Sequence, residues 1–330
     1  MTFHYKEISA DQREYLKVHG RTVCNQGLCI SWSNGGVELN FVGKRLEFHF
    51  DTYESEQPVY VKAYTEIGEQ RFGLYGITPK VILEFESEEK HTVKLLRISE
   101  GDVPLILKGI KAFGENPVFA EPPAEKKMRL EFLGDSITAG FGVVASADQD
   151  TYYTYEQDST KAYAYMTAQL LDAEIRTEAI SGQGVYRNCN GEAGVQFKRI
   201  FDMAIRTQDG YDHSQWIPDV MVLNCGTNDE PGGTDEETMY KEADFLLNKV
   251  RDAYPKTKII WTYGLMNSKY HDTFTKLISD KNKNGDRNLY YLPLEQITLE
   301  QNEIGAIGHP NVNASERAAK KLAKFIEEIV

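Results

Sequence analysis

The hydrophobic pattern of this chain changes near residue 115, and that change constrains the fold more than any other feature of the sequence. Before it, apolar and polar residues alternate in short runs, such as "VELNF" at 37–41 and "RLEFHF" at 45–50. A period of two, with turn signals such as "SNGG" between the runs, indicates short antiparallel strands. Many such strands without long helices predict an all-β sandwich or jelly-roll domain over residues 1–120.

After residue 115, runs typical of strands alternate with runs of helical spacing. Residues 114–127, "GENPVFAEPPAEKK", carry three prolines and several charges and are typical of a linker. The alternation that follows predicts a parallel sheet with helices on both faces, over residues 128–330. The expected N-cap of the last helix is Asn313 or Ser315. The predicted strands cover 128–134, 175–180, 218–226, 258–264 and 289–293, and the predicted helices cover 159–174, 237–255, 271–281 and 313–330.

Charge and cysteine content limit the classes of partner. The net charge of −13, from 37 basic and 50 acidic residues, repels phosphate backbones and disfavours nucleic acid as a partner. It also disfavours anionic membranes and acidic polymers, so a neutral substrate fits best. The four cysteines form no CxxC pair, which disfavours a zinc ribbon. We expect free thiols, with a pair between Cys24 and Cys29 as the alternative.

No export or membrane signal is visible in the sequence. The first residues, "MTFHYKEISADQ", have no apolar segment behind a basic end. No apolar run reaches the roughly 18 residues that a membrane span needs. We therefore expect a cytoplasmic protein without a membrane partner, and the sequence does not fix its oligomeric state.

A serine follows the first strand of the predicted parallel sheet, in "EFLGDSITAGFG" at 131–142. Sites in open parallel sheets form at the carboxyl ends of the strands, and Gly134 permits a tight turn that aims the Ser136 hydroxyl outward. A serine hydroxyl becomes a nucleophile only with a base and an oxyanion site. Two other strand ends offer oxyanion donors: the Gly182 N–H in "AISGQG" and the Asn228 amide in "LNCGTND".

Histidine is the base that acyl chemistry needs near neutral pH, and three histidines follow Ser136. His213 precedes a predicted strand and so lies at the wrong edge of the sheet. His271 starts a predicted helix at the right edge and is the second choice. His309, in "GAIGHPNVNASE" between the last strand and the last helix, is the preferred base.

The motifs "GDSIT", "SGQG", "GTND" and "HPN", in this order, resemble the four sequence blocks of the SGNH hydrolases, also called GDSL esterases. The resemblance covers residues 128–330 and implies a flavodoxin-like α/β domain. It also implies that Ser136 is the nucleophile and His309 the base, with the Ser136 N–H, Gly182 and Asn228 as the oxyanion hole. It implies neither a metal nor an organic cofactor.

Three further motifs, two of them in the front half of the chain, narrow this resemblance to one family of esterases. "GRT" at 20–22, "WSNGGVELNFVG" and "SQWIPDVMVLNCGTND" are similar to carbohydrate esterase family two, whose members carry a jelly roll before the SGNH domain. That family removes O-acetyl groups from plant polysaccharides, often at the 6-position of hexopyranosides. The resemblance therefore implies acetylated mannan or xylan oligosaccharides as substrates. Two alternatives remain: a lipase or thioesterase for longer acyl esters, and a carbohydrate-binding protein with an inactive site.

The sequence departs from the family pattern beside the histidine. Most SGNH enzymes have an aspartate two or three residues before it, whereas this chain has Ala306 and Ile307, and Glu303 is the nearest preceding carboxylate. We expect a Ser–His dyad oriented by a backbone carbonyl, with Glu303 as a displaced third member in the alternative. Some relatives place a tryptophan next to the histidine, where this chain has Gly308. Tyr186 is the candidate for a sugar-binding wall, unless its ring packs against other residues.

Overall fold

The computed structural model describes residues 4–52, 56–76, 78–101 and 103–330. The chain forms two compact units. The first comprises the residues up to Glu125 together with Ala204–Thr207, and the second comprises Lys126–Met203 and Gln208–Val330.

The first unit is built from antiparallel sheets. Within its described residues there are two sheets of six strands: β3-β4-β11-β6-β9 with β1 on β11, and β12-β5-β10-β7-β8 with β2 on β5. The strands are β1 (His4–Ser9), β2 (Lys17–His19), β3 (Thr22–Cys24), β4 (Leu28–Ile30), β5 (Gly36–Val42), β6 (Arg45–Asp51), β7 (Val59–Thr65), β8 (Gly68–Leu74), β9 (Lys80–Glu84), β10 (Lys90–Arg97), β11 (Leu105–Gly114) and β12 (Val118–Ala120).

The alternating residues of both sheets share one core, as the period of two predicts. Leu39 and Phe41 of β5 and Leu46 and Phe48 of β6 are each 0% exposed and lie in the same hydrophobic cluster. Side chains two apart on a strand point to one face, so this burial makes the two sheets a sandwich. The jelly-roll connectivity stays a prediction.

The predicted linker at 114–127 is wrong in part, because it contains β12. Phe119 lies opposite Phe41 on the neighbouring strand and is 4% exposed. The apolar triplet Val118–Ala120 lies between the prolines of this segment, so they flank the strand without removing its donors.

A short segment from the second half of the chain, Ala204–Thr207, belongs to the first unit. The Trp32 indole Nε1 donates to the Ala204 carbonyl at 3.0 Å, and Arg206 pairs with Glu100 at 3.2 Å. The predicted domain boundary near residue 120 assigns this segment to the second domain, so it misses the contribution of Ala204–Thr207 to the first unit.

The second unit holds a five-stranded parallel sheet in its described residues, in the order β14-β13-β17-β18-β19. Its strands are β13 (Met128–Gly134), β14 (Ala173–Ala179), β17 (Val220–Asn224), β18 (Lys258–Tyr263) and β19 (Leu289–Pro293). The strands β15 (Met203–Ile205) and β16 (Gln208–Asp209) form a separate two-stranded sheet. The chain steps outward from β13 to β14 and then returns to β17 on the other side, so the order reverses between β13 and β17. This reversal is the position where flavodoxin-like sheets bind ligands.

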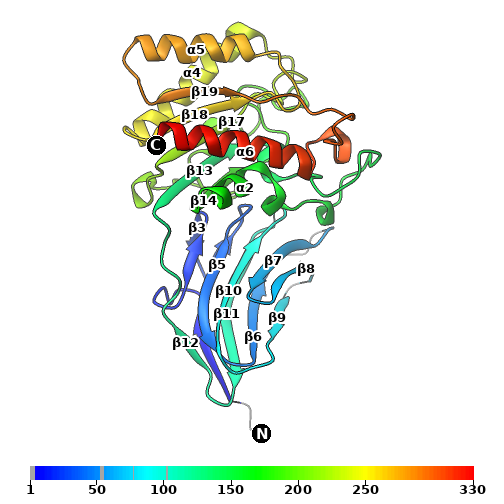
Figure 1. Cartoon of the computed structure of the whole chain (residues 1–330), viewed down its shortest axis with the longest axis vertical. Coiled ribbons are helices and arrows are strands. Elements are labelled where there is room, and N and C mark those ends of the chain that lie inside the picture. The colour runs from blue at the N-terminus through cyan, green and yellow to red at the C-terminus, as the bar shows by residue number, and fades with distance from the viewer. Residues whose placement is uncertain (1–3, 53–55, 77, 102) are drawn as a thin grey trace. The chain divides into compact units, whose positions relative to one another are not determined.

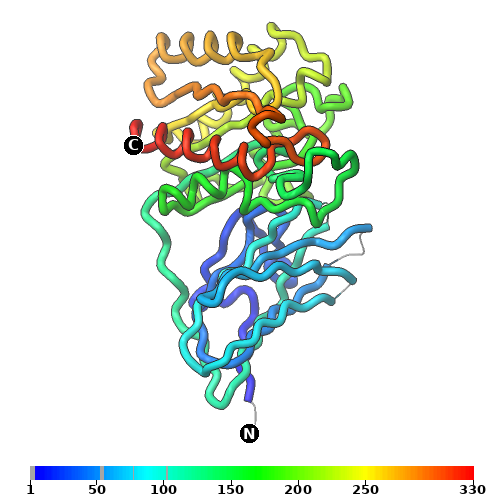
Figure 2. The backbone as a smooth tube through the Cα atoms, turned by 45° about the vertical axis from the view of Figure 1, so that its right-hand side comes forward, coloured from blue at the N-terminus to red at the C-terminus, as the bar shows by residue number. Residues whose placement is uncertain are grey.

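Helices cover both faces of this sheet, as the strand–helix alternation predicts. Because crossovers are right-handed, those on opposite sides of β13 place α2 on one face and α4 and α5 on the other. Helix α6 lies beside α2, and α5 beside α4 (Figures 1 and 2). The helices are α1 (Ser136–Ala139), α2 (Tyr163–Leu170), α3 (Phe197–Ile200), α4 (Glu236–Ala253), α5 (His271–Lys283) and α6 (Val312–Ile329), with 3₁₀ turns at Thr154–Glu156, Ser159–Lys161, His213–Gln215 and Ala306–Gly308.

Two helix starts differ from the predicted ones. Asn311 caps α6, since its side chain accepts from the N–H groups of Asn313 and Ala314, so the predicted caps Asn313 and Ser315 are wrong. Helix α2 begins at Tyr163 rather than 159, because Asp158 caps a separate 3₁₀ turn ahead of it. None of the helices in the described ranges is long and apolar enough to cross a membrane.

Candidate active site

Ser136 lies where β13 meets α1, at the strand end that the sequence predicts. Asp135 caps this short helix through a 3.0 Å hydrogen bond from the Ile137 N–H, and the Ser136 residue is 4% exposed. A Cβ at position 134 would lie 2.0 Å from the Thr138 Oγ1. Gly134 is therefore needed because the helix packs closely onto the strand end.

His309 contacts the serine. Its Nε2 lies 3.0 Å from the Ser136 Oγ, and its Nδ1 lies 3.1 Å from the Ile307 carbonyl oxygen. A carbonyl oxygen only accepts, so the proton is on Nδ1 and the lone pair of Nε2 is left for the serine hydroxyl. Burial lowers the pKa of His309 below its usual range, while the Ile307 and Ala306 carbonyls act in the opposite direction. The imidazole is thus neutral near neutral pH, as a general base requires.

Ile307 presents its carbonyl from an unusual backbone conformation. Its φ of 50° and ψ of 38° are in the left-handed region, which β-branched residues rarely adopt. The loop is held by hydrogen bonds from the Gly305 N–H to the His309 carbonyl (2.7 Å) and from the Ile307 N–H to the Gln149 carbonyl (2.9 Å). Such strain persists only where surrounding contacts enforce it, and it is common at functional sites.

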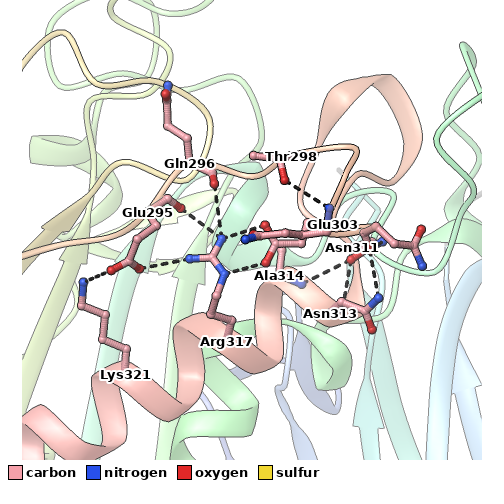
Figure 3. A network of polar contacts seen from close by, with 11 residues as sticks. Glu295, Gln296, Thr298, Glu303, Asn311, Asn313, Ala314, Arg317 and Lys321 are labelled. Atoms are coloured by element: carbon pink, nitrogen blue, oxygen red, sulfur yellow. Dashed lines mark hydrogen bonds and ion pairs between the residues drawn. The ribbon is translucent and has the colours of Figure 1, made fainter.

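Glu303 does not reach the histidine. The Arg317 guanidinium takes both of its carboxylate oxygens, Nη2 lying 2.9 Å from Oε2, and the Glu303 side chain is 4% exposed (Figure 3). Arg317 also binds Glu295 and the Gln296 carbonyl, which fixes the segment before the loop to α6. In the part of the chain that the structure describes, no carboxylate hydrogen-bonds to His309, so the alternative triad through Glu303 is not formed.

The predicted oxyanion donors come from three strand ends. Gly182 follows β14 with a φ of 79°, a conformation that favours glycine. Over the described ranges, neither the Ser136 N–H nor the Gly182 N–H donates to a protein acceptor. The Asn228 Nδ2 donates to the Gln183 carbonyl at 2.8 Å and to the Asp135 Oδ2 at 3.3 Å. Asn228 therefore links the loops of Ser136 and Gly182, and its role as an oxyanion donor stays a prediction.

Asp229 has a role that the sequence reasoning missed. Its carboxylate is 0% exposed and accepts from the consecutive N–H groups of Val185, Tyr186 and Arg187 at 2.7, 2.8 and 2.9 Å. Burial raises the pKa of Asp229, and these hydrogen bonds oppose that shift. The carboxylate thereby shapes the loop that follows Gly182. The sequence feature that could have indicated this role is its position as the last residue of the motif "GTND".

Tyr186, the predicted sugar-binding wall, and the two other candidate bases, His271 and His213, have contacts of their own. Tyr186 is half-buried on the loop that Asp229 holds, with the Arg187 guanidinium 5.5 Å from its ring centre. His271 hydrogen-bonds to the Tyr291 hydroxyl, and His213 lies 3.0 Å from the Tyr254 hydroxyl. Of the three candidate bases, His309 is the one whose ring contacts the Ser136 hydroxyl in the described structure.

No group of three or more His, Cys, Asp or Glu side chains is placed to hold a metal ion among the residues described. All four cysteines are free thiols, so the alternative pair Cys24–Cys29 is not formed.

Solved structures resemble this chain over nearly its whole length. An acetyl xylan esterase (Est2A) from Butyrivibrio proteoclasticus superposes with a TM-score of 0.89 at 24% identity, covering 99% of both chains. A family two carbohydrate esterase from Clostridium thermocellum, solved with cellohexaose, superposes with a TM-score of 0.86 at 23% identity, covering 95% of this chain and 98% of the other. These likenesses show the fold.

Curated relatives are longer than the matched region. The cellulase/esterase CelE of Acetivibrio thermocellus is 26% identical over 314 residues, which are 90% of this chain and 37% of that protein. The acetylxylan esterase / glucomannan deacetylase of Cellvibrio japonicus is 24% identical over 270 residues, 76% of this chain and 71% of that protein.

The family comparison covers the whole site. The model of the GDSL-like lipase/acylhydrolase family matches residues 132–325, a range that contains Ser136, Gly182, Asn228 and His309. The match extends over more than half of the chain. This protein therefore belongs to the GDSL-like lipase/acylhydrolase family.

Proposed function

We propose that this protein is a serine carbohydrate esterase that removes O-acetyl groups from oligosaccharides. The observation that carries the proposal is the relay from Ser136 Oγ through the neutral His309 ring to the Ile307 carbonyl, with distances of 3.0 and 3.1 Å. The names of the relatives, an acetylxylan esterase / glucomannan deacetylase among them, support the substrate class.

The geometry supports a two-step acyl transfer. The His309 Nε2 accepts the hydroxyl proton of Ser136 while the Oγ attacks the acetyl carbonyl. The N–H groups of Ser136 and Gly182, with the Asn228 side-chain amide, stabilise the developing oxyanion. His309 then donates this proton to the departing sugar oxygen, so the sugar leaves as an alcohol and the acetyl group stays on Ser136 as an ester. Water attacks this ester with the same base, and acetate is released.

The finer substrate assignment rests on resemblance and charge. We take acetylated mannan or xylan oligosaccharides as the substrates, with preference for 6-O-acetyl hexopyranosides, and Tyr186 as a wall for the sugar. The net charge of −13 favours a neutral glycan over an acidic one. The cytoplasmic location expected from the sequence stays a prediction.

Acetate release from defined oligosaccharides tests the proposal. The protein is incubated with acetylated manno-, xylo- and gluco-oligosaccharides, and NMR locates the acetyl groups that are lost. Ser136→Ala is expected to abolish turnover while the circular dichroism spectrum stays unchanged, because the nucleophile is removed from an intact fold.

Two results would contradict the proposal. Faster hydrolysis of octanoyl than of acetyl esters would identify a lipase or thioesterase. Failure of an organophosphonate to label Ser136, together with oligosaccharide binding, would identify a carbohydrate-binding protein with an inactive site.

A further inference from the structure

The imidazole of His309 has an aromatic neighbour besides its two hydrogen-bond partners. The centre of the Phe141 ring lies 4.5 Å from the centre of the His309 ring, with 39° between the ring planes. This distance is at the short end of the range for aromatic pairs, so the rings meet through their faces rather than edge to edge. Hydrogen bonds at Nδ1 and Nε2 hold these two atoms but only weakly oppose a tilt of the ring about the line that joins them. A second ring packed against the imidazole blocks this tilt by contact.

The backbone of Phe141 is joined to the residue that carries the nucleophile. Its N–H donates to the Ser136 carbonyl at 3.0 Å, at the end of helix α1. Gly140, the C-cap of this helix, has a φ of 78° and turns the chain through the left-handed conformation that favours glycine. A Cβ at position 140 would lie 3.0 Å from the Asp158 carbonyl oxygen. The tight turn therefore fixes the Phe141 backbone to Ser136, while the Phe141 ring contacts His309.

A second ring supports Phe141. Tyr152 stacks on it, with 4.0 Å between the ring centres and 15° between the planes. The Tyr152 hydroxyl donates to the Gln157 Oε1, and the Gln157 Nε2 donates to the Ala139 carbonyl of α1 at 2.8 Å. Gln157 is 0% exposed, so the loss of either hydrogen bond would leave a buried polar atom unsatisfied. The support of the Phe141 ring is thus attached to the same helix as the nucleophile.

The electrostatic surroundings of His309 give the Phe141 ring a second function. The hydrogen-bond and ring partners of His309 in the described residues are all uncharged: the Ser136 hydroxyl, the Ile307 carbonyl and the Phe141 ring. In a triad, a carboxylate stabilises the imidazolium that forms when the histidine accepts the serine proton. A cation over an aromatic face, within about 6 Å of the ring centre, is also stabilised, because that face is negative. The Phe141 ring lies within this distance of His309.

We propose that Phe141 is the positioning residue of the Ser136–His309 dyad. Its ring keeps the imidazole aligned with the serine hydroxyl and stabilises the imidazolium formed by proton transfer, and Tyr152 holds that ring in place. An aromatic ring thus performs the two functions that a carboxylate has in a triad. This inference rests on the proposed acyl transfer, in which Ser136 is the nucleophile and His309 the base.

NMR of the histidine ring nitrogens tests the orientation without turnover. The full-length protein is labelled with nitrogen-15 histidine, and the signals of His309 are those that disappear in His309→Ala. The unmodified protein is expected to show a protonated Nδ1 and an unprotonated Nε2. In Phe141→Ala we expect a mixture of the two tautomers, because the ring is free to tilt. The pKa of His309 is expected to rise toward the usual value of about 6.5, because water reaches the uncovered face of the imidazole.

Kinetics on an acetyl ester test the effect on catalysis. In Phe141→Ala, kcat is expected to fall about 10- to 100-fold while KM changes less than about threefold, because the alignment and the imidazolium matter in the transition state. Phe141→Leu keeps an apolar cover without an aromatic face and is expected to lose about three- to tenfold in kcat. Phe141→Tyr keeps the ring and is expected to retain most of the activity.

Tyr290→Ala is the matched control, since Tyr290 is a half-buried aromatic residue of the same unit whose ring pairs with Phe325 at 5.9 Å. It is expected to leave kcat and the His309 signals unchanged. The proposal is overturned if folded Phe141→Ala keeps its kcat, or if kcat falls while the His309 signals stay unchanged. It is also overturned if Phe141→Tyr loses as much activity as Phe141→Ala, or if Tyr290→Ala alters the His309 signals equally. Full activity in Phe141→Leu overturns the stabilisation of the imidazolium.

The two measurements separate this inference from the proposed function. A protein that releases acetate from oligosaccharides, and does so equally well as Phe141→Ala, refutes the positioning role and leaves the esterase. A protein that hydrolyses no acetyl ester, but whose His309 signals change in Phe141→Ala and not in Tyr290→Ala, refutes the esterase and leaves the orientation of His309 by Phe141. Circular dichroism of each variant shows that the compared proteins are folded.

Discussion

At the scale of single residues, the orientation of His309 by a carbonyl rather than a carboxylate has consequences for its charge. A carboxylate at Nδ1 stabilises the imidazolium and raises the pKa of a histidine, whereas a carbonyl dipole does so less. Burial therefore dominates here and lowers the pKa of His309. The base stays neutral, and ready to accept a proton, into mildly acidic solution.

This difference predicts the pH dependence of catalysis. The value of kcat/KM for a neutral acetyl ester is expected to fall as pH decreases through the pKa of His309, with a midpoint below the usual histidine value of about 6.5. The measurement is initial rate against pH, with circular dichroism at each pH to show that the protein stays folded. A midpoint above about 7 would contradict the assignment of a carbonyl partner.

The variant Glu303→Gln tests whether a carboxylate helps to orient His309. Because Glu303 binds Arg317 and not His309, kcat is expected to fall less than about tenfold, whereas loss of the carboxylate of a true triad costs about 10⁴. Stability is expected to fall by about 1–3 kcal/mol, since a buried partner of Arg317 is weakened. Chemical denaturation measures the second effect.

The control for that variant is Glu295→Gln. Glu295 pairs with the same arginine at 3.0 Å, but its side chain is 60% exposed, so little change in stability is expected. A decrease of several decades in kcat for Glu303→Gln alone, with the fold intact, would restore Glu303 as a triad member.

At the scale of loops and elements, Asp229 determines the shape of the segment that follows Gly182. In Asp229→Asn, one of the oxygens that face three N–H groups becomes an NH₂ group, which repels a neighbouring donor. We expect kcat for an acetyl ester to fall about 10- to 100-fold with a smaller change in KM. The displaced segment follows directly after Gly182, and the proposed oxyanion contact of Gly182 acts mainly in the transition state.

Asp235→Asn is the control for this change. Asp235 caps α4 by accepting from the Thr238 N–H at 2.8 Å, and asparagine caps helices equally well, so activity and stability are expected to stay close to those of the unmodified protein. Equal kcat in Asp229→Asn and the unmodified protein would show that the loop keeps its shape without the carboxylate.

The elements that sequence predicts best are those whose evidence is local. Strands β13 and β19 match their predicted ranges because an apolar run ends at turn residues. The Ile307 carbonyl leaves no mark in the sequence, since every residue has one and only the backbone conformation aims it. Asn311 and Asn313 are the same residue type, so their helix-capping preference is equal. The N-cap of α6 is Asn311 because the helix begins at Val312. Contacts of Asp229 and of Ala204–Thr207 depend on segments far apart in the chain.

At the scale of the whole molecule, the charge balance acts on any substrate that approaches from solution. A net charge of −13 repels anions over a distance set by ionic strength, about 30 Å in 0.01 M salt and about 3 Å in 1 M salt. Neutral oligosaccharides feel no such field. Oligosaccharides that carry uronic acid side groups are repelled in dilute salt and less so in concentrated salt.

We therefore predict opposite salt responses for two substrates that share the same acetyl group. From 0.01 to 0.5 M NaCl, kcat/KM for an acetylated neutral xylo-oligosaccharide is expected to stay constant. For its uronic-acid-substituted counterpart it is expected to rise several-fold, because screening removes the repulsion between like charges. Acetate release measured on both substrates at each salt concentration separates this effect from any general effect of salt on the enzyme. If kcat/KM for the acidic substrate falls as salt is added, a local cationic group must attract the uronic acid despite the overall charge.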